Sequence, residues 1–152
     1  MRPDTTWERI PEADFYVPGS VDTISAAPVL CARICRLGKC VGAKFARRYF
    51  DGVGRGLLLY PESLVESGPE GFAAACCVDR TSHFPLPEEN PDSLAEADRD
   101  LLCRALEQAS ANCRVRTGDF LCVETGPRTV LCKREGAENE VHAQGCDFRI
   151  IF

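Results

Sequence analysis

The chain has 152 residues, of which 45% are apolar and 27% charged, with 18 basic and 23 acidic side chains and a net charge of −5. This length suits one compact domain with a buried core, and the composition argues against a disordered chain. The sequence shows no basic patch, which argues against nucleic acid or an anionic membrane as the main partner. The apolar runs are too short to cross a bilayer, and the first residues start no signal peptide. We therefore expect a cytoplasmic protein without a membrane partner.

The ten cysteines are a dense set for an intracellular chain. No C-x-x-C pair occurs and only two histidines, His83 and His142, are present, so a zinc site has little support. A disulfide framework is possible in number, but the sequence gives no sign of an oxidising compartment. We interpret most of the cysteines as small buried apolar side chains.

The first sixty residues predict short elements separated by turn residues. Prolines punctuate residues 2–20, which should form extended pieces and turns. The β-branched and apolar run 28–37 predicts a strand. Within 41–49, apolar side chains recur at every fourth position, which predicts a short amphipathic helix. Three glycines in 52–56 predict a flexible loop, followed by a buried strand at 57–60.

The next thirty residues, 61–91, are rich in turn residues and predict irregular structure. A helix should follow Pro91. Asp92 or Ser93 can cap this helix, and Glu96 stands at capping-box distance from Ser93. Its apolar stripe comprises Leu94, Leu101, Leu102, Ala105, Leu106 and Ala109.

The C-terminal part alternates apolar and polar residues by twos. Residues 120–123 and 129–132 predict two strands of a hairpin around a turn at 125–127, and 148–152 predict a last strand. Strands near both ends and few helices indicate an α+β fold.

Six segments, in this order and at these separations, resemble motifs of the fumarylacetoacetate hydrolase (FAH) family, among them "KPDT", "RFAHRYYDAV", "GDLI" and "DFRI". The segments are Arg2-Pro3-Asp4-Thr5, Phe15-Tyr16-Val17-Pro18, residues 32–39 (ARICRLGK), residues 44–51 (KFARRYFD), Gly118-Asp119-Phe120-Leu121 and Asp147-Phe148-Arg149-Ile150. The resemblance implies a β-rich, FAH-like mixed-sheet roll with a few short helices. It also implies a single domain over 1–152, shortened at the N-terminus and in the 61–91 region.

The family's chemistry implies a divalent cation, usually magnesium, held by three carboxylates, which polarises a dicarbonyl substrate. Two carboxylates come from an "E-x-E" strand and one from "DFTARD", while a later lysine and an N-terminal histidine assist. In this sequence the carboxylate positions fall on Ala27, Val29 and Leu58, and the lysine position falls on Cys76. The histidine segment has no counterpart, and of the reactive set Asp79 remains.

Hydrocarbon side chains cannot bind magnesium. Glu62 stands where the "TARD" motif has its arginine, so the charge at that position is reversed. We therefore expect no metal ligand, no catalytic residue and no cofactor, the ancestral Mg²⁺ site being absent. A residual apolar pocket should remain, formed by Ala27, Val29, Leu58, Cys76 and Asp79.

The expected function is a non-catalytic FAH homologue, a pseudoenzyme that acts as a binding or regulatory domain. Its expected partners are a small apolar or keto-acid ligand and a second subunit, in a homodimer or a heterodimer with a full-length relative. The alternative is a diverged hydrolase or isomerase that acts on a small dicarbonyl or keto-acid compound with metal-free chemistry. A third possibility is a decaying gene product that keeps the fold without a selected activity.

Several side chains allow both a chemical and a structural interpretation. Cys76-Cys77 could supply a thiol nucleophile with His83 as base. Asp79 could be a remnant of the family's site, but it and the residues around it fit a simple turn better. His142 should be solvated. A cluster of Lys44, Arg47 and Arg48 could bind an acidic partner, but the outer face of a short helix is usually solvated.

Overall fold

The computed structural model describes residues 4–10, 12–136 and 139–152. Arg2 and Pro3 of the first motif, and Pro11, lie outside these described residues. The chain divides into two compact units. The first unit comprises Met1–Pro28, Gly56–Pro85 and Thr125–Phe152, and the second comprises Val29–Arg55 and Leu86–Glu124.

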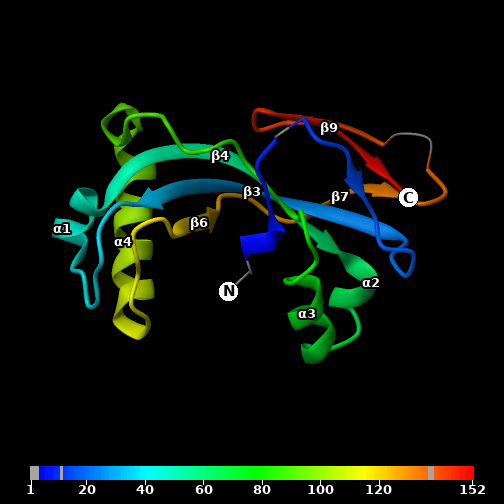
Figure 1. Cartoon of the computed structure of the whole chain (residues 1–152), viewed down its shortest axis with the longest axis horizontal. Coiled ribbons are helices and arrows are strands. Elements are labelled where there is room, and N and C mark those ends of the chain that lie inside the picture. The colour runs from blue at the N-terminus through cyan, green and yellow to red at the C-terminus, as the bar shows by residue number, and fades with distance from the viewer. Residues whose placement is uncertain (1–3, 11, 137–138) are drawn as a thin grey trace. The chain divides into compact units, whose positions relative to one another are not determined.

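The described elements alternate strands with short helices and include one long helix (Figure 1). The strands are β1 (Trp7–Glu8), β2 (Phe15–Tyr16), β3 (Thr23–Ile34), β4 (Phe50–Pro61), β5 (Ser82–His83), β6 (Phe120–Glu124), β7 (Thr129–Lys133), β8 (Glu140–Ala143) and β9 (Cys146–Ile151). The α-helices are α1 (Ala43–Ala46), α2 (Glu62–Val65), α3 (Pro69–Ala75) and α4 (Glu96–Asn112), and the 3₁₀ turns are η1 (Asp4–Thr6), η2 (Arg47–Tyr49) and η3 (Pro91–Ser93). The mixed α+β class expected from the sequence is confirmed.

The first unit contains two sets of paired strands. In one, β1, β5, the second part of β4 and the first part of β3 lie side by side, and β7 pairs with β3. In the other, β9 lies between β2 and β8. Their facing apolar side chains form one core, which comprises Phe15, Val17, Val21, Ile24, Ala26, Leu57, Leu59, Cys132, Val141, Cys146, Phe148 and Ile150.

The second unit places α4 against the remaining parts of β3 and β4 and against β6. Leu102 and Leu106, two members of the expected apolar stripe, are fully buried in its core. The core comprises Leu30, Ala32, Ile34, Val41, Ala46, Phe50, Val53, Leu102, Leu106 and Val115. The predicted helix 41–49 is confirmed as α1 continued by η2.

The three-glycine segment is strand rather than the predicted flexible loop. A Cβ at Gly52 would collide with the Pro87 carbonyl oxygen, and one at Gly56 would collide with the His83 carbonyl oxygen. Glycine therefore allows another stretch of backbone to approach β4 closely. The loop prediction therefore assigned these three glycines the wrong structural role.

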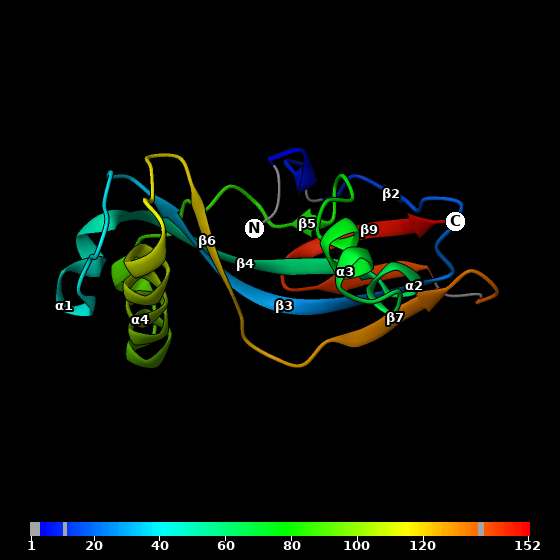
Figure 2. The same ribbon diagram turned by 90° about the horizontal axis from the view of Figure 1, so that it is seen from below.

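The predicted hairpin is also wrong, because β6 and β7 each pair with β3 and not with each other (Figure 2). β6 runs antiparallel to residues 29–33 of β3, and β7 runs antiparallel to residues 23–26. Pro28 lies between these two stretches and has no N–H to donate, so the ladder is interrupted there. The Thr125 N–H still donates to the Pro28 carbonyl at 2.8 Å.

The remaining differences concern element ends. Residues 61–91 hold α2, α3 and β5 rather than irregular structure, and Pro69 occupies the first turn of α3. Neither Asp92 nor Ser93 caps α4, which begins after Ala95. Instead, the Asn90 side chain caps η3 by accepting from the Asp92 N–H. The strand predicted at 28–37 is β3, shifted toward the N-terminus, and the last strand is confirmed as β9.

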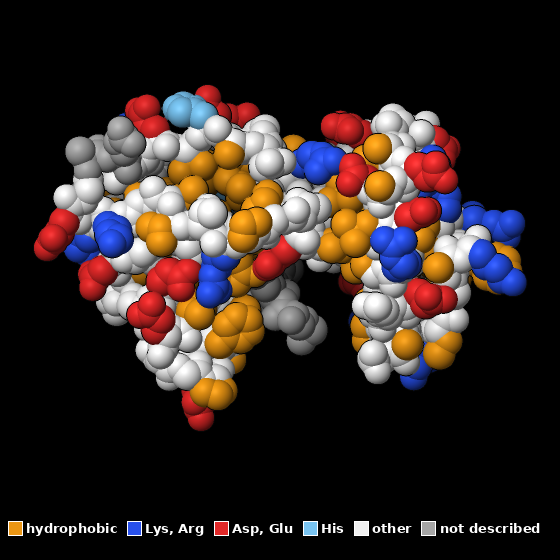
Figure 3. Space-filling model, turned by 180° about the vertical axis from the view of Figure 1, so that it is seen from behind, with side chains coloured by type: hydrophobic (Ala, Val, Ile, Leu, Met, Phe, Trp, Pro, Cys, Tyr) orange, Lys and Arg blue, Asp and Glu red, His pale blue; other side chains and the backbone are white. Residues whose placement is uncertain are grey.

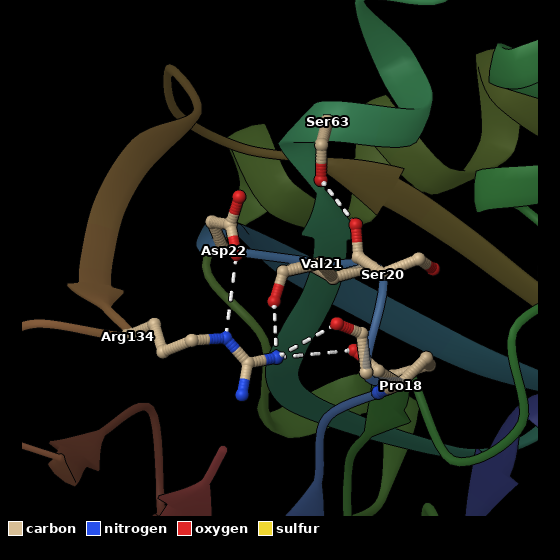
Figure 4. Close-up of polar contacts among 7 residues, drawn as sticks. Pro18, Ser20, Val21, Asp22, Ser63 and Arg134 are labelled. Atoms are coloured by element: carbon tan, nitrogen blue, oxygen red, sulfur yellow. Dashed lines mark hydrogen bonds and ion pairs between the residues drawn. The ribbon is translucent and has the colours of Figure 1, made fainter.

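Arg134 binds the segment between β2 and β3 in the first unit through hydrogen bonds and an ion pair (Figure 4). Its guanidinium donates to the carbonyls of Pro18, Gly19 and Val21, the last at 2.8 Å, and pairs with the Asp22 carboxylate at 3.3 Å. These bonds add to the Val21 N–H bond to the Pro18 carbonyl and hold the segment to the loop that carries Arg134.

Over the part of the chain that the structure describes, no helix combines the length and hydropathy that a membrane span requires.

Candidate functional site

The strand positions where the resemblance puts carboxylates are buried and hydrocarbon. In the first unit, Ala27 on β3 is fully buried and Leu58 on β4, which lies opposite Ser82 of β5, is 8% exposed. In the second unit, Val29 on β3 is fully buried opposite Glu124 of β6. None of these side chains can coordinate a cation.

The other two predicted pocket residues follow α3 in the first unit. Cys76 is half-buried at the C-terminal cap of the helix, and Asp79 is exposed in a turn. The turn position of Asp79 agrees with the simpler of its two interpretations. Two surface cavities stand out in the structure, both in the second unit, and none of the five predicted pocket residues lines either of them.

Glu62, which the resemblance aligns with the arginine of the "TARD" motif, forms an ion pair with Arg128. Its carboxylate lies 3.1 Å from Arg128 Nε and accepts a hydrogen bond from the Ser25 hydroxyl. The Arg128 guanidinium also lies over the Tyr60 ring, 5.0 Å from its centroid. Since the Glu62 side chain is only 16% exposed, this network neutralises a mostly buried charge.

The donor set for magnesium is not present at these positions. Asp51, the nearest acid before Leu58 in sequence, pairs with Arg33 at 2.7 Å. Across residues 4–10, 12–136 and 139–152, no three His, Cys, Asp or Glu side chains gather where one metal ion could bind them. The residues at the three strand positions therefore do not fit the implied cation.

His83 lies in the first core, where its backbone carbonyl accepts from the buried Cys146 thiol at 3.4 Å. Its ring stacks on Phe148 with centroids 4.0 Å apart and meets Phe15 edge-on at 6.0 Å. Neither ring nitrogen has a hydrogen-bond partner among the described residues. Burial lowers the pKa of His83 to about 4. His83 is thus a neutral core side chain at neutral pH, and no hydrogen bond joins it to Cys76.

A cationic cavity of about 280 Å³ lies beside α1 in the second unit. Its lining residues are Arg36, Lys39, Cys40, Val41, Gly42, Phe45, Arg48 and Tyr49, which include three cations, two aromatic rings and no carboxylate. Arg36, Lys39 and Arg48 take part in no ion pair with any described carboxylate. The lining itself therefore carries net positive charge, and the Glu107 carboxylate lies next to it, where it accepts a hydrogen bond from the Ala43 N–H at 3.0 Å.

Phe45 is an aromatic side chain of the lining that contacts two cations, Arg48 of the same lining and the neighbouring Lys44. It is 46% exposed, with Lys44 Nζ 4.9 Å and Arg48 Cζ 5.8 Å from its ring centroid. In Figure 3, Lys and Arg side chains gather around a hydrophobic side chain at the right-hand end of the view. Cations over a ring face are attracted by its quadrupole, so the ring helps to hold them in place.

Backbone contacts hold the wall of this cavity in position. Gly38 and Val115 exchange hydrogen bonds of 3.1 and 2.9 Å, and the Cys40 N–H donates to the Ser110 carbonyl at 2.8 Å. A Cβ at Gly38 would lie 2.6 Å from the Tyr49 ring and 2.8 Å from the Val41 side chain, so a larger residue would have to displace one of them. Cys40 adopts a left-handed conformation with φ of 53°. The loop is therefore a defined structure with contacts to the Ser110 end of α4.

A second cavity, of about 500 Å³, lies on the other side of α1 and is mixed in charge. Arg47 and Asp92 form an ion pair of 2.7 Å across it, and this bond lowers the pKa of Asp92. Its lining also includes Lys44, Arg99, Asp100 and Arg104. Because it contains its own carboxylates, this cavity is a weaker anion site than the cationic cavity.

Sequence reasoning identified Lys44, Arg47 and Arg48 but missed Arg36 and Lys39. The signal was present in the charge distribution, because residues 29–55 contain seven basic side chains and one acidic side chain, Asp51. The overall charge of −5 concealed this segregation.

Comparison with known proteins shows the fold. No profile of a known family and no curated protein sequence matches the chain. Among solved structures, Cg1458 matches with a TM-score of 0.75 at 12% identity, covering 93% of this chain and 65% of that one. A Yersinia pestis CO92 protein assigned to the fumarylacetoacetate hydrolase family matches with a TM-score of 0.68 at 14% identity, covering 99% and 83% of the two chains.

A third solved structure is fumarylpyruvate hydrolase from Pseudomonas aeruginosa in complex with Mn²⁺ and pyruvate. It matches with a TM-score of 0.64 at 14% identity, covering 99% of this chain and 76% of that one. The chain thus spans 65% of the length of the first of these structures. Its fold is that of the FAH family, and several proteins with this fold are named as hydrolases or isomerases.

Proposed function

We propose that the chain is a non-catalytic binding domain with the FAH fold, and that it holds a small organic anion in the cationic cavity. The observation that carries the proposal is the lining of that cavity, where Arg36, Lys39 and Arg48 meet no carboxylate. Buried hydrocarbon at Ala27, Val29 and Leu58 supports the loss of metal-dependent chemistry. The proposal keeps a cytoplasmic location and a dimeric state, with itself or with a full-length relative.

The lining also favours one chemical class of ligand. A guanidinium and an ammonium suit a carboxylate, which Arg can bind through two parallel hydrogen bonds. The half-exposed Phe45 ring offers a face for a flat conjugated group next to the charge. A 2-oxo acid combines a carboxylate with a planar carbonyl, so we favour a keto acid over an uncharged apolar ligand.

Calorimetric titration of the full chain tests this site with three probes: pyruvate, inorganic phosphate, and methyl pyruvate as the uncharged analogue. We expect saturable binding of pyruvate that weakens at least tenfold in Arg48→Gln, and no binding of methyl pyruvate. Tighter binding of phosphate than of pyruvate would keep the anion site but replace the ligand class.

The matched control is Arg114→Gln, because Arg114 is an exposed cation of the same unit that does not line the cavity. This variant should bind pyruvate like the parent chain. Absence of saturable binding for every anion, or equal binding by the triple variant Arg36→Gln/Lys39→Gln/Arg48→Gln, would overturn the proposal. Such a result would also favour a fold kept without a selected activity.

The second candidate is an enzyme that acts on a small dicarbonyl or keto-acid compound without a metal, and the named hydrolases and isomerases of the same fold favour it. Turnover of an acylpyruvate by the purified chain, abolished by Cys76→Ala or Asp79→Asn, would establish this function. Under the binding-domain proposal, no turnover occurs, and titration with Mg²⁺ or Mn²⁺ shows no stoichiometric binding. Tight binding of either metal would mean that the carboxylates had been misplaced.

A further inference from the structure

Two cysteines of the second unit stand directly opposite each other on neighbouring strands. Cys31 of β3 pairs with Cys122 of β6 in antiparallel register, and their sulfur atoms lie 3.0 Å apart. The two residues are 91 positions apart in sequence, so the pair is a product of the fold. All ten cysteines lie among the described residues, and none is disulfide-bonded.

The hydrogen bonds around the pair define its type. The Ile34 N–H donates to the Asp119 carbonyl at 2.8 Å, just beyond the paired residues Arg33 and Phe120. That pattern makes Arg33–Phe120 a non-hydrogen-bonded pair, and the alternation of antiparallel strands gives Cys31–Cys122 the same type, two residues along. In such pairs the Cα atoms are about 4.5 Å apart, which lies within the range that a disulfide requires.

The two thiols differ in access. Cys31 is fully buried, whereas Cys122 is half-buried and so can be reached from solvent. The other buried cysteines, Cys132 and Cys146, have no such opposing thiol in their strand registers, and burial raises the pKa of each to about 11. Those two thiols should stay protonated and unreactive.

We propose that Cys31 and Cys122 form an intrachain disulfide when the protein meets a disulfide oxidant such as glutathione disulfide. The Cys122 thiolate attacks one sulfur of the oxidant, which releases one glutathione thiolate and leaves a mixed disulfide on Cys122. Cys31 then loses its proton and attacks the Cys122 sulfur, expelling the second glutathione. Two protein thiols are oxidised, one glutathione disulfide is reduced to two thiols, and the protons pass to solvent.

The bond would join β3 to β6 covalently within the second unit, the unit that also contains the cationic cavity. In a reducing compartment the pair stays as thiols, and under oxidation the strand pairing becomes fixed. The chain then has two states that differ in how readily β6 separates from β3. This modification site is independent of the proposed ligand.

Peptide mapping of the folded chain after incubation with glutathione disulfide tests the proposal. Trypsin gives one peptide, 10–33, in which Cys31 is the only cysteine, and another, 117–128, in which Cys122 is the only cysteine. We expect these two peptides to be joined before reduction and separate after it, together with a loss of two hydrogen atoms from the intact chain. The oxidised chain should also unfold at a higher temperature than the reduced one.

Cys122→Ser should abolish the joined peptide and the thermal shift, and Cys31→Ser should leave glutathione attached to Cys122. Cys113→Ser is the matched control, because Cys113 is exposed and lies outside the pair, and it should behave like the parent chain. If Cys122 stops at the glutathione adduct in the parent chain, or if other cysteine peptides join in place of these two, the proposal is wrong.

Discussion

The two units differ in how their charged side chains are paired. Among the described residues, four carboxylates of the first unit each pair with an arginine, and three arginines of the second unit pair with carboxylates, while the cations of the cationic cavity do not. The pairs of the first unit are Glu8–Arg80, Asp14–Arg149, Asp22–Arg134 and Glu62–Arg128, and those of the second are Arg33–Asp51, Arg47–Asp92 and Arg55–Asp98. The resemblance places four of the five predicted pocket residues in the first unit, whereas the cationic cavity lies in the second.

The cores of the two units should be equally intolerant of lost volume, and this is the largest effect we expect. Phe148→Ala should lower the free energy of unfolding by about 3–5 kcal/mol, and Leu106→Ala by about 2–5 kcal/mol. Phe148 fills the first core against His83, and Leu106 is fully buried in the second. Denaturant unfolding followed by circular dichroism measures both. A loss below 1 kcal/mol in either variant would show that the corresponding core is loosely packed.

His83 makes the first unit sensitive to acid in a way that the second is not. Because its pKa falls from 6.5 to about 4 on folding, the unfolded chain takes up the proton first, and stability decreases as pH falls from 6.5 toward 4. The loss should reach about 3 kcal/mol. His83→Phe keeps the ring stack on Phe148 and should remove this part of the pH dependence. Denaturant unfolding of both chains at pH 7, 5.5 and 4.5 isolates it as a difference.

At pH 7, His83→Phe should be neutral or stabilising, because no hydrogen bond of either ring nitrogen is lost among the described residues. A clear destabilisation at pH 7 would mean that the imidazole has a partner that phenylalanine cannot replace.

Variants of the Glu62–Arg128 pair test whether this ion pair stabilises the folded chain. Arg128→Gln should cost about 1–3 kcal/mol, because it leaves a mostly buried carboxylate without its cation. The double variant Glu62→Gln/Arg128→Gln should recover part of that loss, and thermal unfolding of the parent chain, the two single variants and the double variant gives the coupling. A loss in the double variant equal to the sum of the two single losses would show that the two charges do not interact.

The exposed pair Arg47–Asp92 in the second unit is the comparison with the smallest expected effect. Asp92→Asn should change the thermal midpoint by less than the experimental error, because exposed pairs are screened by solvent. The pKa of Asp92 should lie below the usual aspartate value, measured by carboxyl NMR titration, and Arg47→Gln should raise it toward that value, because the bond from Arg47 is the main cause of the lowering. An unshifted carboxyl would mean that the pair does not persist in solution.

Patterns of neighbouring residues in the sequence predicted the two helical segments that follow from short-range contacts. Leu102 and Leu106 gave the long helix, and the four-residue spacing of 41–49 gave α1 with η2. The hairpin prediction failed because it paired β6 and β7 with each other. Both strands pair instead with β3, some hundred residues earlier in the chain, and Pro28 interrupts the ladder between them. A single sequence carries no signal for such long-range pairing.

The candidate site shows the same limit. Alignment to the family's motifs located Ala27, Val29 and Leu58 on strands, and the structure shows them buried. It could not find the Arg128 partner of Glu62, the approach of Arg36 and Lys39 to Arg48, or the apposition of Cys31 and Cys122. Each of these depends on segments that only folding brings together.

The interruption opposite Pro28 has a practical use. After the bond from the Thr125 N–H to the Pro28 carbonyl, the chain leaves the ladder for residues 126–128, and Thr125 and Pro127 are exposed. Extra residues placed after Pro127 would lengthen a crossing that makes no strand pairing, and so would leave the register on both sides unchanged. A fluorescent or affinity tag inserted there could report on the folded chain while both of its ends stay untouched.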